Sequence, residues 1–230
     1  MIKNLKLIKV LYIWAFAFHG LLWVHMFQHG EKKDLAIVTM ALGLLLIWGV
    51  ALACIQIKIS INIKPIKQSS IRYFLSIIGM MIFLALLAEV ISSLMTQTAH
   101  LWQLSPNVAY ITATPNYIEL VTKHSVIVFI PQFIAIAYIH YKVKFSANQW
   151  FYIYGLIGYL NEWIAFGSAA SWVSIPYWII IYGWIVYLPT YLFHPKVERK
   201  TPRVYHFVLA CMIPLALSIP WALLIIKWFH

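Results

Sequence analysis

Two glutamates stand inside strongly apolar stretches of the sequence and are the first candidates for chemistry. Glu89 lies in the run Leu-Leu-Ala-Glu-Val-Ile, and Glu162 directly follows Asn161 among aromatic and aliphatic residues. Neither glutamate has a lysine or arginine three or four positions away, which would supply an ion pair along one helix. A carboxyl group in such surroundings must be protonated or paired with a group from another segment. We therefore expect both glutamates, with Asn161, to bind a proton, a cation or a substrate.

Four more ionisable residues belong to the same set of candidates. His19 stands near the middle of the first apolar segment, and Glu119, Lys123 and His124 lie near the start of the fourth. A histidine titrates near neutral pH and suits a proton relay, whereas Lys123 would form a fixed ion pair with a buried carboxylate. Glu119 also has a structural alternative. Asn116, three positions earlier, resembles the first residue of a helix capping box, and Lys123 is four positions later.

His25 and His29 are the candidates for a metal site. A spacing of four residues places two imidazoles on the same face of a helix, as metal ligands require. The alternative is a pair of solvated histidines at the membrane interface, because His29 begins a charged turn. The sequence contains no phosphate-binding glycine loop, no GxSxG elbow and no histidine-box set, so it specifies no cofactor.

The overall composition is that of a membrane protein. Of the 230 residues, 63% are hydrophobic and only 10% are charged, whereas a soluble domain carries roughly 25% charged residues. The net charge is +11, but the basic residues form short clusters between apolar runs. This pattern is typical of membrane topology rather than of nucleic-acid binding. We expect one all-α, polytopic transmembrane domain over residues 1–230, with the lipid bilayer as its main partner and no nucleic-acid partner.

The apolar runs are long enough for a bundle of about seven transmembrane helices, since each crossing needs about 20 residues. The expected helices cover residues 9–27, 35–57, 73–95, 116–141, 149–171, 175–193 and 204–228. Gly155 and Gly158 give the fifth helix a small face on which another helix can pack closely. Prolines inside the later helices free backbone carbonyls that need other partners: Pro131, Pro189, Pro214 and Pro220.

The lysines and arginines determine the expected orientation. Thirteen of them fall in alternate connections on one side of the membrane, and four fall on the other side. Because the richer side faces the cytoplasm, we expect the N-terminus inside, and the odd number of helices then places the C-terminus outside. The corresponding location is the cell (inner) membrane, which the chain crosses several times.

The candidate residues share one half of the membrane. By a rise of about 1.5 Å per residue, the candidates for substrate or proton binding lie between the midplane and the outer surface: Glu89, Glu162, Asn161, His19, His124, Lys123 and Glu119. The inner half holds little beyond His140 and His206. This asymmetry predicts a polar pocket that opens outward, in which one of the nearby histidines, or Lys123, contacts at least one of the two buried glutamates.

Three classes of function are open. The first is a small permease coupled to protons or cations, in which the buried glutamates bind the coupling ion and a histidine relays protons. The second is a membrane-embedded enzyme acting on a lipid or isoprenoid, with paired carboxylates as general acid and base or with a divalent metal. The third is a non-catalytic subunit of a larger membrane complex, which suits a small, apolar chain with short loops. The substrate of the first class is a small molecule, and a homo-oligomer is open for all three.

Overall fold

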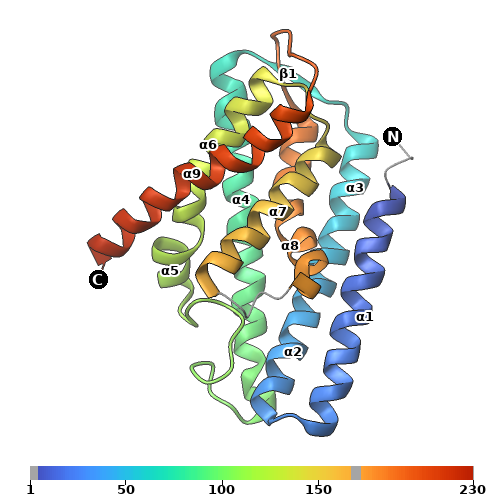
Figure 1. Cartoon of the computed structure of the whole chain (residues 1–230), viewed down its shortest axis with the longest axis vertical. Helices are drawn as coiled ribbons and strands as arrows, with labels where there is room; N and C mark the ends of the chain where they lie inside the picture. The colour runs from blue at the N-terminus through green and yellow to red at the C-terminus, as the bar shows by residue number, and fades with distance from the viewer. Residues whose placement is uncertain (1–4, 167–171, 230) are drawn as a thin grey trace.

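The computed structural model describes residues 5–166 and 172–229, which are almost entirely helical (Figure 1). Within these residues, five helical segments are long and apolar enough to cross a membrane: Leu7–His29, Lys32–Asn62, Ser70–Trp102, Trp172–Leu192 and Val204–Ile225. A sixth crossing results if the bent pair Tyr117–His124 and Val126–Lys142 is one span. The all-α class is confirmed, and the apolar helices are compatible with an integral membrane protein.

The fifth expected helix, over residues 149–171, is present but is too polar to count among these spans. It is α7 (Ala147–Phe166), a helix of 20 residues whose asparagines, glutamine and glutamate lower its hydropathy. Within the described residues, five or six segments therefore meet the length and hydropathy of a membrane span. Part of the expected range, residues 167–171, lies outside the described residues, as do Lys3, the side chain of Lys6 and His230.

The helices follow one another through the bundle with few strands between them. The N-terminal half consists of α1 (Leu5–His29), α2 (Lys32–Leu44), the π-helical η2 (Leu45–Leu52), α3 (Ala53–Asn62), β1 (Ile66–Gln68), α4 (Ser70–Gln97) and the 3-10 segment η3 (Thr98–Trp102). The C-terminal half consists of α5 (Tyr117–Glu119), the π-helical η4 (Leu120–His124), α6 (Val126–Lys142), α7, η6 (Trp172–Ser174), α8 (Ile175–Leu192), β2 (Phe193–Pro195) and α9 (Val204–Phe229). Figure 1 shows α1 along one edge of the bundle and α9 crossing obliquely to the opposite edge.

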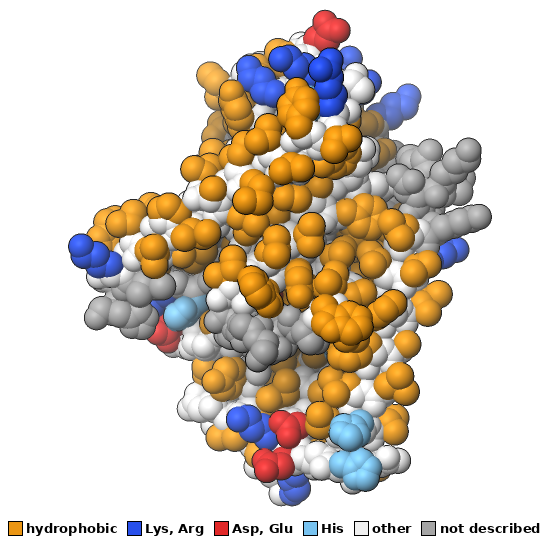
Figure 2. All heavy atoms as spheres, in the orientation of Figure 1, with side chains coloured by type: hydrophobic (Ala, Val, Ile, Leu, Met, Phe, Trp, Pro, Cys, Tyr) orange, Lys and Arg blue, Asp and Glu red, His pale blue; other side chains and the backbone are white. Residues whose placement is uncertain are grey.

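Short stretches of backbone pairing join the loops at one end of the bundle. Strands β1 and β2 pair in parallel, and an isolated bridge between Val143 and Lys200 adds the loop that follows α6. Figure 2 shows Lys and Arg side chains gathered at this end, above a broad band of hydrophobic side chains. We call it the basic end, and it comprises residues 63–69, 143–146 and 193–203.

Helices α7 and α8 pack closely because glycines line their interface. A Cβ atom added to Gly155 would lie 2.7 Å from the backbone of Ile179, and one added to Gly158 would lie 2.1 Å from the ring of Tyr182. A Cβ atom added to Gly183 on α8 would likewise be too close to α7. The predicted role of the small face of α7 in helix packing is confirmed.

The expected single helix over residues 116–141 is broken near its start. Segment η4 and helix α6 meet at Ser125, whose φ of −123° and ψ of −87° are not helical, and the axis bends by 45° there. Further along, Pro131 has no N–H to donate to the carbonyl of Ile127. The indole N–H of Trp221 on α9 donates to this carbonyl instead, at 2.8 Å. The expectation that a proline frees a carbonyl for another partner is confirmed here.

Candidate functional site

Glu89 and Glu162 come from different helices and lie near each other. Glu89 is on α4 and Glu162 is on α7, and both side chains are partly buried. The two carboxyl groups are close enough to interact electrostatically. The structure thus brings together the two acids that the sequence analysis assigned to one pocket, although more than 70 residues of chain separate them.

A hydroxyl group on a neighbouring element lies beside each acid. The phenol of Tyr182 on α8 donates to Oε1 of Glu162, and the hydroxyl of Ser125 lies within hydrogen-bonding reach of Glu89. The sequence analysis expected a histidine or a lysine as the partner and missed both hydroxyls, because serine and tyrosine do not stand out in an apolar helix. We call the four residues Glu89, Ser125, Glu162 and Tyr182 the carboxyl cluster.

Tyr182 is held against α7 by its surroundings. Its ring lies over Gly158, one turn before Glu162. The rings of Phe129 and Tyr154 stand edge-on to it, with centroids 5.8 Å and 6.2 Å away. The Tyr154 hydroxyl is itself buried without a hydrogen-bond partner in the described part of the chain. The missing side chain at Gly158 is what allows the phenol of Tyr182 to reach the carboxyl group.

Ser125 owes its position to the break between η4 and α6. Its backbone N–H bonds to the carbonyl oxygen of Leu120, five residues earlier, at 2.9 Å, which is the π-helical pattern. Its hydroxyl has a single proton, which it donates to the Leu120 carbonyl at 3.2 Å, and the carboxyl group of Glu89 is a second acceptor nearby. It therefore donates to one of them at a time.

His19 approaches the carboxyl cluster through an aromatic neighbour. It is buried on α1, and its Nδ1 lies 2.9 Å from the carbonyl oxygen of Ala15. Because a carbonyl only accepts, Nδ1 carries a proton and Nε2 is the acceptor of the neutral ring. The ring centroid is 4.5 Å from that of Tyr177 on α8, and Tyr177 interacts electrostatically with Glu162. His19 is thus linked to Glu162 through Tyr177.

Asn161 belongs to an amide network beside the carboxyl cluster. Its Nδ2 donates to Oε1 of Gln132 at 3.3 Å, and Nε2 of Gln132 donates to Oδ1 of Asn161 at 3.2 Å. The same Nε2 donates to the hydroxyl of Ser218 at 2.9 Å. Gln132 is fully buried, and the sequence analysis missed both it and Ser218. The network joins α6, α7 and α9, so it holds these three helices together.

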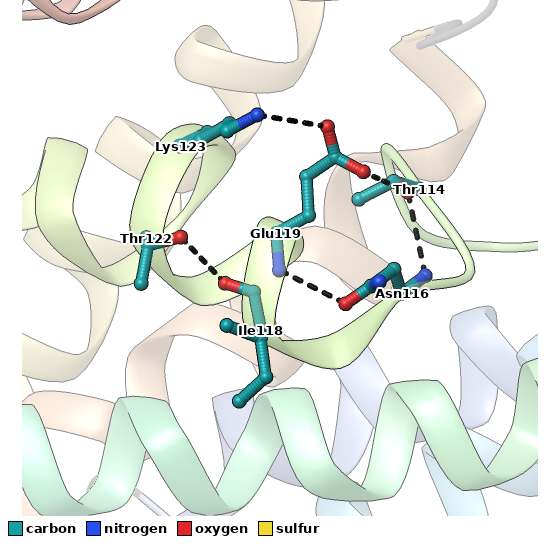
Figure 3. A network of polar contacts seen from close by, with 6 residues as sticks. All are labelled: Thr114, Asn116, Ile118, Glu119, Thr122 and Lys123. Atoms are coloured by element: carbon teal, nitrogen blue, oxygen red, sulfur yellow. Dashed lines mark hydrogen bonds and ion pairs between the residues drawn. The ribbon is translucent and has the colours of Figure 1, made fainter. Parts of the chain in front are cut away.

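Glu119, Lys123 and His124 lie at the start of the broken helix, where Glu119 takes a structural role (Figure 3). Its carboxylate pairs with Lys123 at 3.3 Å and accepts a hydrogen bond from Thr114. Its backbone N–H donates to Oδ1 of Asn116 at 3.1 Å, as the expected helix cap requires. The Glu119 side chain is 37% exposed, and His124 is exposed. The geometry therefore supports the capping alternative for Glu119.

His25 and His29 are neighbours on one face of α1, as their spacing predicts. Their ring centroids are 5.4 Å apart, and both side chains are exposed. A metal site needs at least a third protein or solvent ligand. Within the described residues, no group of three or more His, Cys, Asp or Glu side chains is placed to hold a metal ion.

A second polar cluster, which the sequence analysis missed, lies at the basic end. His140 on α6 is fully buried and accepts a hydrogen bond from the indole N–H of Trp150 at 2.8 Å. Arg199 Nη1 lies 3.4 Å from the carbonyl oxygen of His140, and the ring of His194 is 5.8 Å from that of His140. We call His140, His194 and Arg199 the basic-end cluster. The sequence analysis named His140 but not His194 or Arg199, which come from the loop region and complete a cluster around this buried histidine.

Comparisons of this chain with protein-family models, with curated proteins and with solved structures find no match.

The two clusters differ in what they can bind. The carboxyl cluster holds two acids beside neutral hydroxyl donors, so it can take up a proton or accommodate a small cation. The basic-end cluster offers a guanidinium and imidazole nitrogens, which suit an anion.

Proposed function

We propose that this chain is a small permease of the cell membrane, coupled to protons or to another small cation, with the carboxyl cluster as the coupling site. The observation that carries the proposal is the meeting of Glu89 and Glu162 beside two hydroxyl donors in an apolar helical bundle. Acidic residues are costly in membrane helices and are typical of ion or proton pathways.

Hydroxyl partners suit a group that changes its charge. A phenol or serine hydroxyl donates to a carboxylate and accepts from the protonated acid after a simple rotation, so neither state loses its partner. A lysine or arginine would stabilise only the charged form. Two carboxylates beside each other also repel, so the pair of Glu89 and Glu162 favours binding one proton or one cation.

The bend in the helix before α6 gives this site a means of conformational coupling. Ser125 lies at the bend. Its hydroxyl donates to the carbonyl of Leu120, and Glu89 is the alternative acceptor. Broken helices line the substrate and ion sites of many membrane transporters. In the proposed mechanism, a change in the charge of Glu89 changes the partner of Ser125 and therefore the geometry of the bend.

The position of the acids supports access from the outside. Glu162 follows Ala147, which begins α7, by 15 residues, which corresponds to about 22 Å along the helix. The first residues of α7 follow directly on the basic end. If the basic end faces the cytoplasm, as its lysines and arginines favour, the carboxyl cluster lies in the outer half. His19 on α1, whose ring contacts that of Tyr177, is then the candidate proton relay.

Infrared spectroscopy of the purified protein in nanodiscs tests the proposal without knowledge of the substrate. Acidification produces a carboxylic-acid carbonyl band for each carboxylate that takes up a proton. We expect the component of this band that comes from buried acids to decrease in Glu89→Gln and in Glu162→Gln. It should remain in Glu119→Gln, the matched control, because the side chain of Glu119 is exposed and ion-paired and contributes a separate component. A spectrum that is unchanged in both of the first two variants would contradict a proton-binding role.

Native mass spectrometry with metal analysis of the same preparation separates the other two classes of function. A bound lipid or isoprenoid together with a stoichiometric metal would favour a membrane-embedded enzyme. A second protein chain that stays bound would favour a subunit of a larger complex. The permease proposal expects a monomer or a homo-oligomer with the infrared behaviour described above.

A further inference from the structure

A cleft of about 490 Å³ opens at the basic end, between the start of α7 and the end of α8. Its polar walls come from α7, from β2 and from the loops after α6 and β2. They include Lys144, Asn148, Gln149, His194 and Arg199. This size falls within the range of ordinary small-molecule sites, about 300–1,000 Å³. The cleft lies at the opposite end of α7 from Glu162 and has no part in the proposed permease function.

The charges around this cleft are positive. Lys144 and Arg199 line it, and both of them, with Lys67, act electrostatically on His194. Glu198, the acidic residue of the same loop, is exposed and does not line the cleft. Within the described part of the chain, Arg199 forms no ion pair with a carboxylate. The cleft is therefore a concave site with uncompensated positive charge.

Arg199 has more hydrogen-bond donors than its protein surroundings accept. Its Nη1 lies 3.2 Å from Nε2 and 3.4 Å from the carbonyl oxygen of His140. Because the indole of Trp150 donates to Nδ1 of that ring, Nδ1 is the acceptor and Nε2 carries the proton of a neutral imidazole. A protonated Nε2 does not accept from Arg199. Among the described residues, the guanidinium is left with one long hydrogen bond, to the carbonyl of His140, and most of its five donors are available to a ligand.

The start of α7 adds to the preference for an anion. Gln149 Oε1 accepts from the backbone N–H of Ser146 at 2.8 Å, and Ser146 Oγ accepts from the backbone N–H of Gln149 at 3.3 Å, so the two residues cap the helix. Ala147 and Asn148, which lie between them, line the cleft. The first N–H groups of a helix carry a partial positive charge, which reinforces that of Arg199.

We propose that this cleft binds a phosphate-bearing anion, with Arg199 as the main contact and Lys144 and His194 beside it. A planar guanidinium binds two phosphate oxygens at once, and a lysine adds a point charge. Tyr187 and Tyr191 supply aromatic surface for the rest of the molecule. The headgroup of an anionic phospholipid and a water-soluble phosphate compound share this chemistry, and a cleft at the end of a membrane bundle is accessible to both.

Two binding measurements on the full-length protein distinguish the two sources. In zwitterionic detergent, calorimetry measures the affinity for inorganic phosphate. In nanodiscs of phosphatidylcholine with phosphatidylglycerol, native mass spectrometry measures the retained anionic lipid. Arg199→Gln and Lys144→Gln should each reduce binding about tenfold, the usual effect of losing a hydrogen bond to a charged group. Lys196→Gln is the matched control, because Lys196 is exposed in the same loop and does not line the cleft.

The pattern across the variants decides the outcome. If Arg199→Gln and Lys144→Gln weaken only the binding of inorganic phosphate, the ligand is a soluble phosphate compound. If they reduce only the retained phosphatidylglycerol, the ligand is a lipid headgroup. Equal losses in Arg199→Gln and Lys196→Gln would show diffuse positive charge and overturn the proposal, as would the absence of binding in both measurements. If Arg199→Gln does not fold, Lys144→Gln decides the test, because the Lys144 side chain is exposed.

Discussion

The carboxyl cluster and the basic-end cluster contain side chains of opposite charge. The first joins two acids to neutral hydroxyls, and no lysine or arginine is among its partners in the described structure. The second joins Arg199 to a neutral His140, and no carboxylate is among its partners there. Each cluster therefore lacks the opposite charge that a purely structural site would contain. This difference is the basis of our two proposals, a proton or cation for the first cluster and an anion for the second.

Removing the charge from one cluster at a time should produce the largest effects and is the strongest test of this separation. Glu162→Gln keeps the size of the side chain, and we expect it to remove part of the infrared signal of proton uptake at the carboxyl cluster. It should leave phosphate binding within about twofold, because distant sites act independently. Arg199→Gln should weaken phosphate binding and leave the infrared signal of proton uptake unchanged. Loss of both activities in either variant would show that the two clusters form one coupled site.

The carboxyl cluster was partly predictable because a lone acid in an apolar run is conspicuous. Glu89 and Glu162 could be identified in this way, since burying a carboxyl without a partner costs free energy. Tyr182 and Ser125 could not. The position of Tyr182 depends on a contact with Gly158 across two helices, and that of Ser125 depends on a break in a helix that hydropathy alone treats as continuous.

The cluster at the basic end was missed because its positive charges were explained by membrane topology. Arg199 and its neighbouring lysines were assigned to membrane topology, which explains their number but not their positions. Strand pairing between loops that are distant in sequence brings Arg199 to His140, and no helical periodicity indicates such pairing. Hydropathy is also a weak signal for α7, because glycine contacts with α8 hold this helix in the bundle.

Filling the glycine contact between α7 and α8 should give the next largest effect. The new methyl group of Gly158→Ala would lie 2.1 Å from the Tyr182 ring, so the helices must separate and the phenol must move away from Glu162. We expect a loss of roughly 1–3 kcal/mol of stability, the usual cost of overpacking, together with an altered infrared band. Thermal unfolding in detergent measures the stability. Gly79→Ala is the control, because its added Cβ has nothing within 4 Å, and equal destabilisation by both changes would refute the explanation.

The hydrogen bond at the proline of α6 should have a smaller effect that does not depend on either cluster. Trp221→Phe removes the donor to the Ile127 carbonyl, and we expect a cost of about 0.5–1.5 kcal/mol. In a Pro131→Ala background, the backbone regains an N–H at that position, so Trp221→Phe should cost less there. A double-mutant cycle by thermal unfolding measures the difference. Identical costs in the two backgrounds would mean that the indole does not compensate for the proline.

The smallest expected effect is the response of the basic end to pH. Burial lowers the pKa of His194, and the charges of Arg199, Lys144 and Lys67 lower it further, partly opposed by a hydrogen bond to the Thr190 backbone. Because the unfolded histidine has a pKa of about 6.5, the unfolded chain binds the proton more readily. The contribution of His194 to stability is therefore present at higher pH and is lost as the pH falls below about 6.5.

Melting temperatures across this range isolate the contribution of His194. We expect the wild-type protein to lose more stability than His194→Gln between about pH 7.5 and pH 5. The difference should be small, because the imidazole is only half-buried and solvent screens its charge. Added phosphate should reduce this difference further, because an anion in the cleft favours the protonated ring of His194. Phosphate should leave the response of His194→Gln to acid unchanged. If the melting temperature of His194→Gln falls as steeply with acidification as that of the wild type, another group is responsible for the pH response. Any effect of phosphate on that response would then not depend on His194.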